Sequence, residues 1–152
     1  KENRLNELVE VKNPIDINPA ADDSLHESIT RCFLQDPNVD ALVLCLTPLA
    51  PYLQTLPEGF VPGESLHSQD GIAVLISTLF HQERKPFVVV VDGGKLYDPF
   101  YELLEKNGLP VFPSADQAVA AFAKYIEARL HMGHIRDNRM RLTSLLPASH
   151  TS

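Results

Sequence analysis

Tryptophan is absent from this 152-residue chain, and cysteine occurs only at Cys32 and Cys45. So few cysteines exclude a disulfide-rich secreted protein, and because both lie in apolar stretches we expect them in the core of a protein from a reducing, cytoplasmic compartment. No signal-peptide pattern and no apolar run near ~18 residues is present, which argues against secretion and membrane spanning.

Positive charge is scarce, and the net charge of −7 argues against a nucleic-acid partner. The charge is unevenly distributed along the chain, because the segment from Lys124 onward contains five Lys/Arg and only two acidic residues, Glu127 and Asp137. The simplest interpretation is a solvated helix face, and a docking surface for an acidic module is the alternative.

Several motifs that mark catalytic or cofactor sites are missing. The chain has no GxGxxG, GxxxxGK[ST] or GxSxG, so a dinucleotide fingerprint, a P-loop and a hydrolase elbow are excluded. His131 and His134 have a spacing that some metal sites use, but without Cys or carboxylate partners at a characteristic spacing we expect no metal site. His67 and His81 are interpreted as solvated polar residues.

Two continuous apolar runs of strand length, Ala41–Leu46 and Phe87–Val91, are present. They do not alternate with polar residues, which favours parallel strands covered on both faces. Pro110–Phe112 is a shorter candidate strand, and either Leu8–Val11 or Ile15–Ile17 is another.

Four helices are expected between and after these runs. The first begins near Asp22–Ser24 and ends at Pro37, with an apolar stripe of Leu25, Ile29, Cys32 and Phe33. The second runs from about Ser68 to His81, and the third from about Asp98 to Lys106 with Gly108 terminating it. The fourth begins after Ser114, a candidate N-cap, and Gly133 should weaken or end it. Its expected buried residues are Val119, Phe122, Ala123, Ile126 and Leu130.

This alternation of strands and helices predicts a three-layer α/β fold with a parallel, four- to five-stranded, flavodoxin-like sheet. We expect one domain over residues 1–131, and a helix end with a mobile tail over 132–152. The segment Pro48–Glu64 is an exception, because four of its residues are prolines and two are glycines. Long irregular loops of this kind are usually functional or disordered.

Ligands of open α/β sheets bind beyond the carboxyl ends of the strands, where helix N-termini attract anions. Three segments are expected there: Asn13–Asp16, Thr47–Pro51 and Asp92–Gly94. A CoA, phosphate or carboxylate ligand fits this geometry, and ordinary turns are the alternative. The candidate ligand-edge residues are Asn13, Asp16, Asn18, Thr47, Asp92, Gly93 and Gly94.

Four ordered segments resemble one domain of the NDP-forming acyl-CoA synthetases, the succinyl-CoA synthetase superfamily. They read NPIDINPAADDSLHESI, DPNVDALVLCLTP, KPFVVVVDGG and LLEKNGLPVFPSADQAVAAFAKY, and together they cover roughly Asn13 to Tyr125. Their order and spacing, rather than any single motif, carry the resemblance.

The resemblance implies a part in joining a carboxylate to CoA through a phosphohistidine carried on another domain. CoA and ATP/ADP with Mg are implied for the full enzyme, but none is bound by this domain alone. The implied partners are the CoA-binding Rossmann domain, the phosphohistidine domain and an ATP-grasp module. This chain would carry no catalytic residue, would position the other domains, and would not be active in isolation.

The chain departs from the family pattern at Pro19 and Pro48, where proline supplies no N–H for a phosphate. The glycine-rich strand–helix unit that usually comes first is missing before Lys1. We expect a truncation there, and a site that has drifted from phosphoryl handling is the alternative. Two alternatives stay open. One is a binding or assembly module, including a homodimer, that acts through the Pro48–Glu64 loop or the basic C-terminal helix. The other is a sensor of small anions or nucleotides.

Overall fold

The computed structural model describes residues 12–17 and 20–144, with side chains described as far as Arg136. The chain divides into two compact units, residues 1–118 and 119–152. The candidate strand Leu8–Val11 and the candidate site residue Asn18 lie outside the described residues.

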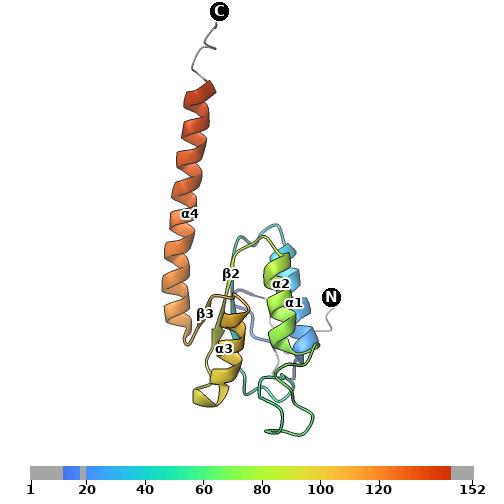
Figure 1. Ribbon diagram of the computed structural model, residues 1–152. Helices are drawn as coiled ribbons and strands as arrows, with labels where there is room; N and C mark the ends of the chain where they lie inside the picture. The colour runs from blue at the N-terminus through green and yellow to red at the C-terminus, as the bar shows by residue number, and fades with distance from the viewer. Residues whose placement is uncertain (1–11, 18–19, 145–152) are drawn as a thin grey trace, which may run out of the picture. The chain divides into compact units, whose positions relative to one another are not determined.

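The first unit alternates helices and strands, as expected (Figure 1). Its strands are β1 (Leu42–Leu46), β2 (Phe87–Val91) and β3 (Val111–Phe112). Its helices are α1 (Asp23–Gln35), α2 (Ile72–Gln82), the short 3-10 helix η1 (Lys95–Tyr97) and α3 (Asp98–Lys106), and α4 (Ala115–Ser144) begins at its end.

The three strands form one parallel sheet in the order β1-β2-β3. Leu42 to Leu46 pair in step with Phe87 to Val91, and Val89 and Val90 pair with Val111 and Phe112. The α/β class and the parallel sheet are therefore confirmed. The sheet has three strands in the described residues rather than four or five, because the segment 15–17 is not a strand.

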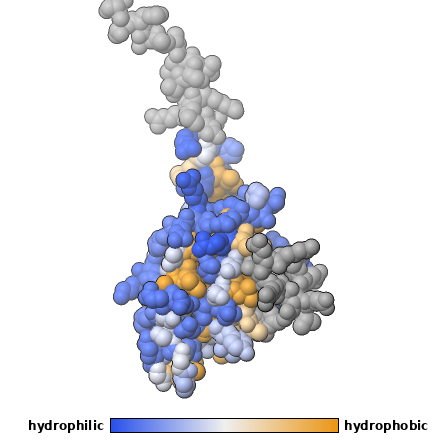
Figure 2. Space-filling view, turned by 90° about the vertical axis from the view of Figure 1, so that its right-hand side faces the viewer, coloured by the Kyte–Doolittle hydropathy of each residue, from blue (hydrophilic) through white to orange (hydrophobic). Residues whose placement is uncertain are grey.

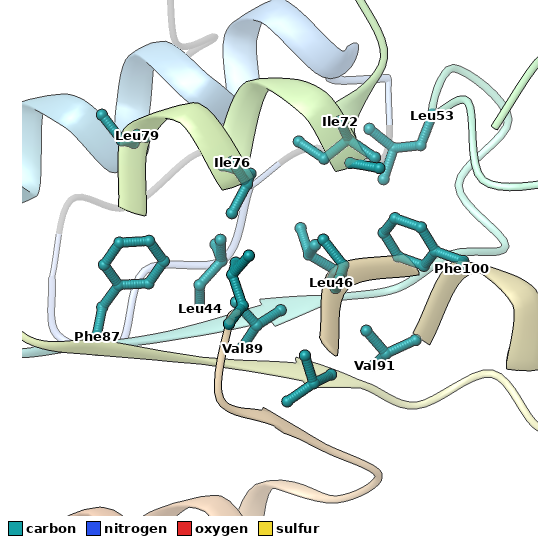
Figure 3. Packing of buried hydrophobic residues seen from close by; sticks show 14 of the residues in the cluster. Leu44, Leu46, Leu53, Ile72, Ile76, Leu79, Phe87, Val89, Val91 and Phe100 are labelled. Atoms are coloured by element: carbon teal, nitrogen blue, oxygen red, sulfur yellow. The ribbon is translucent and has the colours of Figure 1, made fainter. Parts of the chain in front are cut away.

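One face of the sheet carries the main core. Strand side chains such as Leu44, Leu46 and Val89 point towards α2 and α3 and meet Ile76 and Phe100 (Figure 3). Leu34 places α1 in the same cluster, so all three helices cover this face. Only every second strand residue lies in this core, because successive side chains of a strand point to opposite faces of the sheet.

Both cysteines were expected in the core, and this expectation was wrong. Val88 and Val90 are buried on the opposite face of the sheet, but Cys45 on the edge strand β1 is exposed, and Cys32 on α1 is exposed as well. Apolar neighbours in the sequence could not reveal this, because Leu44 and Leu46 point to the other face. Partial burial still raises the pKa of the Cys45 thiol.

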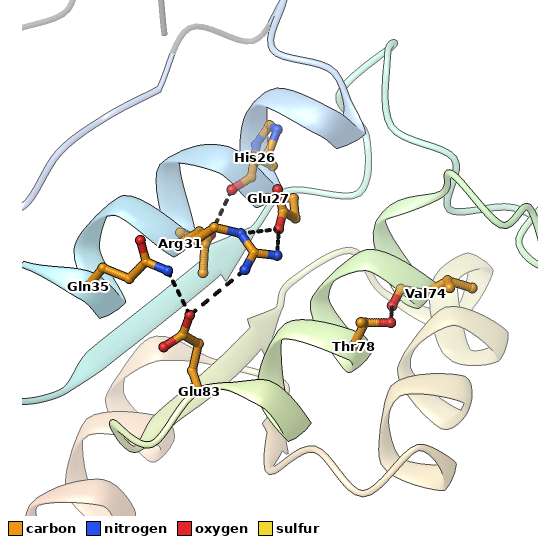
Figure 4. A network of polar contacts seen from close by, with 8 residues as sticks. His26, Glu27, Arg31, Gln35, Val74, Thr78 and Glu83 are labelled. Carbon is orange, nitrogen blue, oxygen red and sulfur yellow. Dashed lines mark hydrogen bonds and ion pairs between the residues drawn. The ribbon is translucent and has the colours of Figure 1, made fainter. Parts of the chain in front are cut away.

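Polar contacts join α1 to α2 (Figure 4). Arg31 binds Glu27 one turn earlier on α1, and its Nη1 lies 3.9 Å from Oε1 of Glu83, the residue that follows α2. Gln35 Nε2 donates to the same Glu83 oxygen over 3.1 Å. These contacts tie the C-terminal ends of the two helices together.

Helix α4 continues to Ser144, so Gly133 does not end it, and a weakening of the helix at Gly133 stays a prediction. Glycine costs about 1 kcal/mol in a helix interior, which the strong helix formers around it offset.

Of the residues expected to be buried on α4, Phe122 is buried and Ile126 is half-buried, but Val119, Ala123 and Leu130 are exposed, so their expected burial was wrong. Hydrophobic side chains of α4 lie among hydrophilic ones (Figure 2). In the described part of the chain, no helix has both the length and the apolar character that a membrane crossing requires.

Candidate functional site

The parallel register brings two of the three expected loop segments together. Leu46 pairs with Val91, so Thr47 and Asp92 leave the sheet side by side at its carboxyl edge. Gly93 packs so closely here that an added Cβ would lie 2.4 Å from Cγ of Pro48 and 2.6 Å from Cδ2 of Tyr97. Only glycine permits this approach, and Gly94 follows with a positive φ of 71°.

The third expected segment, Asn13–Asp16, makes no hydrogen bond through its two candidate side chains in the described residues. Asn13 and Asp16 are both exposed. Thr47 and Asp92 are also exposed. The structure therefore brings Thr47 and Asp92–Gly94 together, but among the described residues no hydrogen bond or ion pair joins them to Asn13 or Asp16.

The loop that follows Thr47 is folded against the domain. Leu53, Leu56 and Leu66 are buried, and the Thr55 hydroxyl donates to the backbone oxygen of Pro48 over 2.9 Å. The Glu64 carboxylate accepts the backbone N–H groups of residues 55 and 56 at 2.9 and 3.0 Å. Of the two outcomes expected for such a loop, functional or disordered, the structure contradicts disorder, and a function of the loop stays a prediction.

A buried carboxylate organises the same edge, and sequence reasoning missed it. Asp23 is only 6% exposed, and its Oδ1 accepts the backbone N–H groups of Ile72 at 2.7 Å and Gln54 at 3.1 Å. It caps α2 from outside that helix, whose own N-cap is Gly71. The signal in the sequence was the pair Asp22-Asp23, because one carboxylate is sufficient to cap α1.

Asp22 caps α1 itself. Its Oδ1 accepts the Leu25 N–H at 2.8 Å and the Ser24 hydroxyl at 2.9 Å, and these bonds hold the pKa of the Asp22 carboxyl below its usual range. At α3, Asp98 stands in the first turn and Pro99 lacks an N–H. The first turns of these helices thus carry carboxylates of the chain, which compete with an external anion for the helix dipole.

The histidines add no metal or nucleophile cluster to this edge. His67 and His81 are exposed, as expected, and His81 Nε2 lies 2.9 Å from the backbone oxygen of Asn107 at the other end of α2. His26, which the sequence did not single out, is buried, and its Nδ1 donates to the backbone oxygen of Asp22 over 3.0 Å. No set of three or more His, Cys, Asp or Glu in the described residues could hold a metal ion.

No protein-family model matches the chain. Among curated proteins, it is 32% identical over 124 residues to the α subunit of the ADP-forming acetate–CoA ligase II of Pyrococcus furiosus. The match covers 80% of this chain. This chain carries an NDP-forming acyl-CoA synthetase-like domain.

A solved structure agrees with this assignment. The synthetase-like domain superposes on PH0766 from Pyrococcus horikoshii with a TM-score of 0.54 and 29% identity over 73% of this chain. The chain spans only about a quarter of these relatives, 24% of the ligase subunit and 23% of PH0766. The resemblance and the fold class inferred from the sequence are thereby confirmed at the level of one domain.

Proposed function

We propose that this domain is the positioning and assembly element of an NDP-forming ligase that joins a carboxylate to CoA. The observation that carries the proposal is the 32% identity to an ADP-forming acetate–CoA ligase subunit over most of this chain. A phosphohistidine on another domain would carry the phosphoryl group, and CoA and ATP or ADP with Mg would bind elsewhere in the full enzyme. We expect such a ligase to work in the cytoplasm.

The carboxyl edge of the sheet is the surface that would meet the phosphohistidine. Thr47 contributes an exposed hydroxyl, and the close packing of Gly93 against Pro48 holds the Asp92–Gly94 loop beside it. Backbone amides that are held in place, with a hydroxyl beside them, can stabilise a transferring phosphoryl group with little reorganisation during the reaction. The domain would therefore contribute geometry rather than a nucleophile.

A second candidate function is a binding module that has kept the fold and lost this chemistry. The specific observation in its favour is the set of carboxylates at the helix starts, with Asp23 already bonded to the first N–H of α2. Asp22 and Asp98 add negative charge at α1 and α3. An incoming phosphate would meet repulsion there.

One assay separates the two functions. The full-length protein that contains this chain is supplied with ATP, CoA and acetate, and acyl-CoA formation and histidine phosphorylation are measured. A ligase forms acyl-CoA and labels a histidine outside residues 1–152, and the isolated chain does neither. If the full-length protein yields neither product, the ligase proposal is wrong and the binding module is favoured.

A further inference from the structure

The two units carry charges of opposite sign. Residues 119–152 hold five Lys/Arg and two Asp/Glu, a net charge of +3, so the first unit carries −10 of the total of −7. Both units also expose large apolar side chains. Surfaces that combine opposite charges with exposed apolar groups are complementary in the way that protein interfaces require.

The acidic surface lies on the folded loop between β1 and α2. Leu49, Tyr52, Phe60 and Val61 are 68%, 59%, 62% and 45% exposed, and we name these four residues the loop surface. They are exposed although the same loop buries three leucines, so their exposure is not a consequence of an unfolded loop. Residues 47–70 contain three carboxylates and no Lys or Arg.

The basic surface lies on one face of α4. Tyr125, Met132 and Ile135 are 47%, 61% and 67% exposed, and their spacing of seven and three residues places them on one side of the helix. Arg129 and Arg136 each follow one of them by four residues and share this side. We name these five residues the helix surface.

We propose that the helix surface of one copy of this chain docks on the loop surface of a second copy, in a reciprocal pair. A two-fold axis then makes the contact twice, so that each copy contributes both its helix surface and its loop surface. Pairing like with like is disfavoured, because helix on helix brings arginines together and loop on loop brings carboxylates together. This inference is independent of the proposed ligase function.

Sedimentation of the 152-residue chain over a range of concentrations tests the pair. We expect a dimer that weakens as the salt concentration rises, because the charges on both surfaces are exposed. The helix variant Met132→Ser/Ile135→Ser and the loop variant Tyr52→Ser/Phe60→Ser should each weaken dimerisation by about tenfold or more. Val119→Ser/Leu130→Ser is the matched control, since both residues are exposed on another side of α4, and it should leave the dimer unchanged.

Mixing the helix variant with the loop variant tests reciprocity. The mixture retains one intact contact, the helix of the loop variant on the loop of the helix variant, so it should dimerise more tightly than either variant alone. Unchanged unfolding midpoints will show that all variants are folded. A strict monomer, a control variant as weak as the helix variant, or a loop variant that dimerises like the unmodified chain would each overturn the proposal.

Discussion

The Oδ1 atom of Asp23, the first residue of α1, lies 2.7 Å from the backbone nitrogen of Ile72, the first residue of α2. The same oxygen accepts the N–H of Gln54 in the long loop. One buried carboxylate therefore fixes two helix starts and a loop at the edge proposed to be functional. It also occupies a position where a helix end would otherwise attract an external anion.

Replacing Asp23 by alanine should lower the free energy of unfolding by about 2–4 kcal/mol, because the buried N–H of Ile72 and the half-buried N–H of Gln54 lose their acceptor. Asp23→Asn keeps an oxygen acceptor and should cost less. Urea unfolding measures both. Asp70→Ala is the control, since Asp70 is an exposed carboxylate near the same helix start and should cost about 1 kcal/mol or less. Equal losses for Asp23→Ala and Asp70→Ala would contradict this role.

Asp22 should make the domain sensitive to acid. Hydrogen bonds from the Leu25 N–H and the Ser24 hydroxyl lower its folded-state pKa, so its stabilising effect is present above the unfolded value of about 3.9 and is lost as the pH falls through the folded pKa. Asp22→Asn keeps an N-capping oxygen without the charge. Unfolding midpoints against pH should show the unmodified chain more stable at neutral pH, with the difference closing below about pH 4. A difference that does not depend on pH would exclude this cause.

Gly93→Ala should destabilise the domain by about 1–3 kcal/mol, because the new methyl group overlaps Pro48 and Tyr97. Chemical denaturation of Gly93→Ala, Pro48→Ala and the double variant measures the coupling between the two loops. The double variant should be more stable than the sum of the single changes predicts, since Pro48→Ala removes the nearest atom. Simple additivity would mean that the two loops are not in contact.

Gly133→Ala should stabilise α4 by about 0.5–1 kcal/mol. No atom lies within 4 Å of the added Cβ, so only helix propensity changes. Hydrogen exchange of the α4 amides measures the effect, and exchange should slow around residue 133. Gly71→Ala is the contrast and should not stabilise the chain, because its Cβ would lie 3.2 Å from the backbone oxygen of Ser68. Faster exchange in Gly133→Ala would show that α4 is not continuous there.

The elements with strong local signals could be predicted to within about a residue. The apolar runs expected at Ala41–Leu46 and Phe87–Val91 are β1 and β2, and Asp98–Lys106 is α3. The second helix begins at Ile72 rather than Ser68, because Gly71 and Ser68 close a backbone turn before it. Propensity and periodicity are local, and they describe such elements well.

The features that depend on distant contacts could not be predicted. The buried face of α1 includes Asp23, His26 and Thr30, and not Cys32 as its apolar stripe indicated. Asp23 is buried because its partners lie 31 and 49 residues away, and no periodicity encodes them. At the site, the strand pattern predicted that Thr47 and Asp92 would meet, but not that helix starts would be capped by carboxylates from within the chain.

The measurement that tests the central claim most directly is the rate of acyl-CoA formation by the full-length protein carrying Thr47→Arg or Asp92→Arg. Both side chains are exposed at the carboxyl edge. The length of an arginine side chain there should hold the phosphohistidine away from the edge without unfolding the domain, although its positive charge attracts phosphate. Gln82→Arg, exposed at the opposite end of α2, is the matched control. We predict a loss of about a hundredfold or more for the two edge variants at unchanged unfolding midpoints, and no loss for the control. Full activity in both edge variants would contradict the assignment of this edge to the reaction.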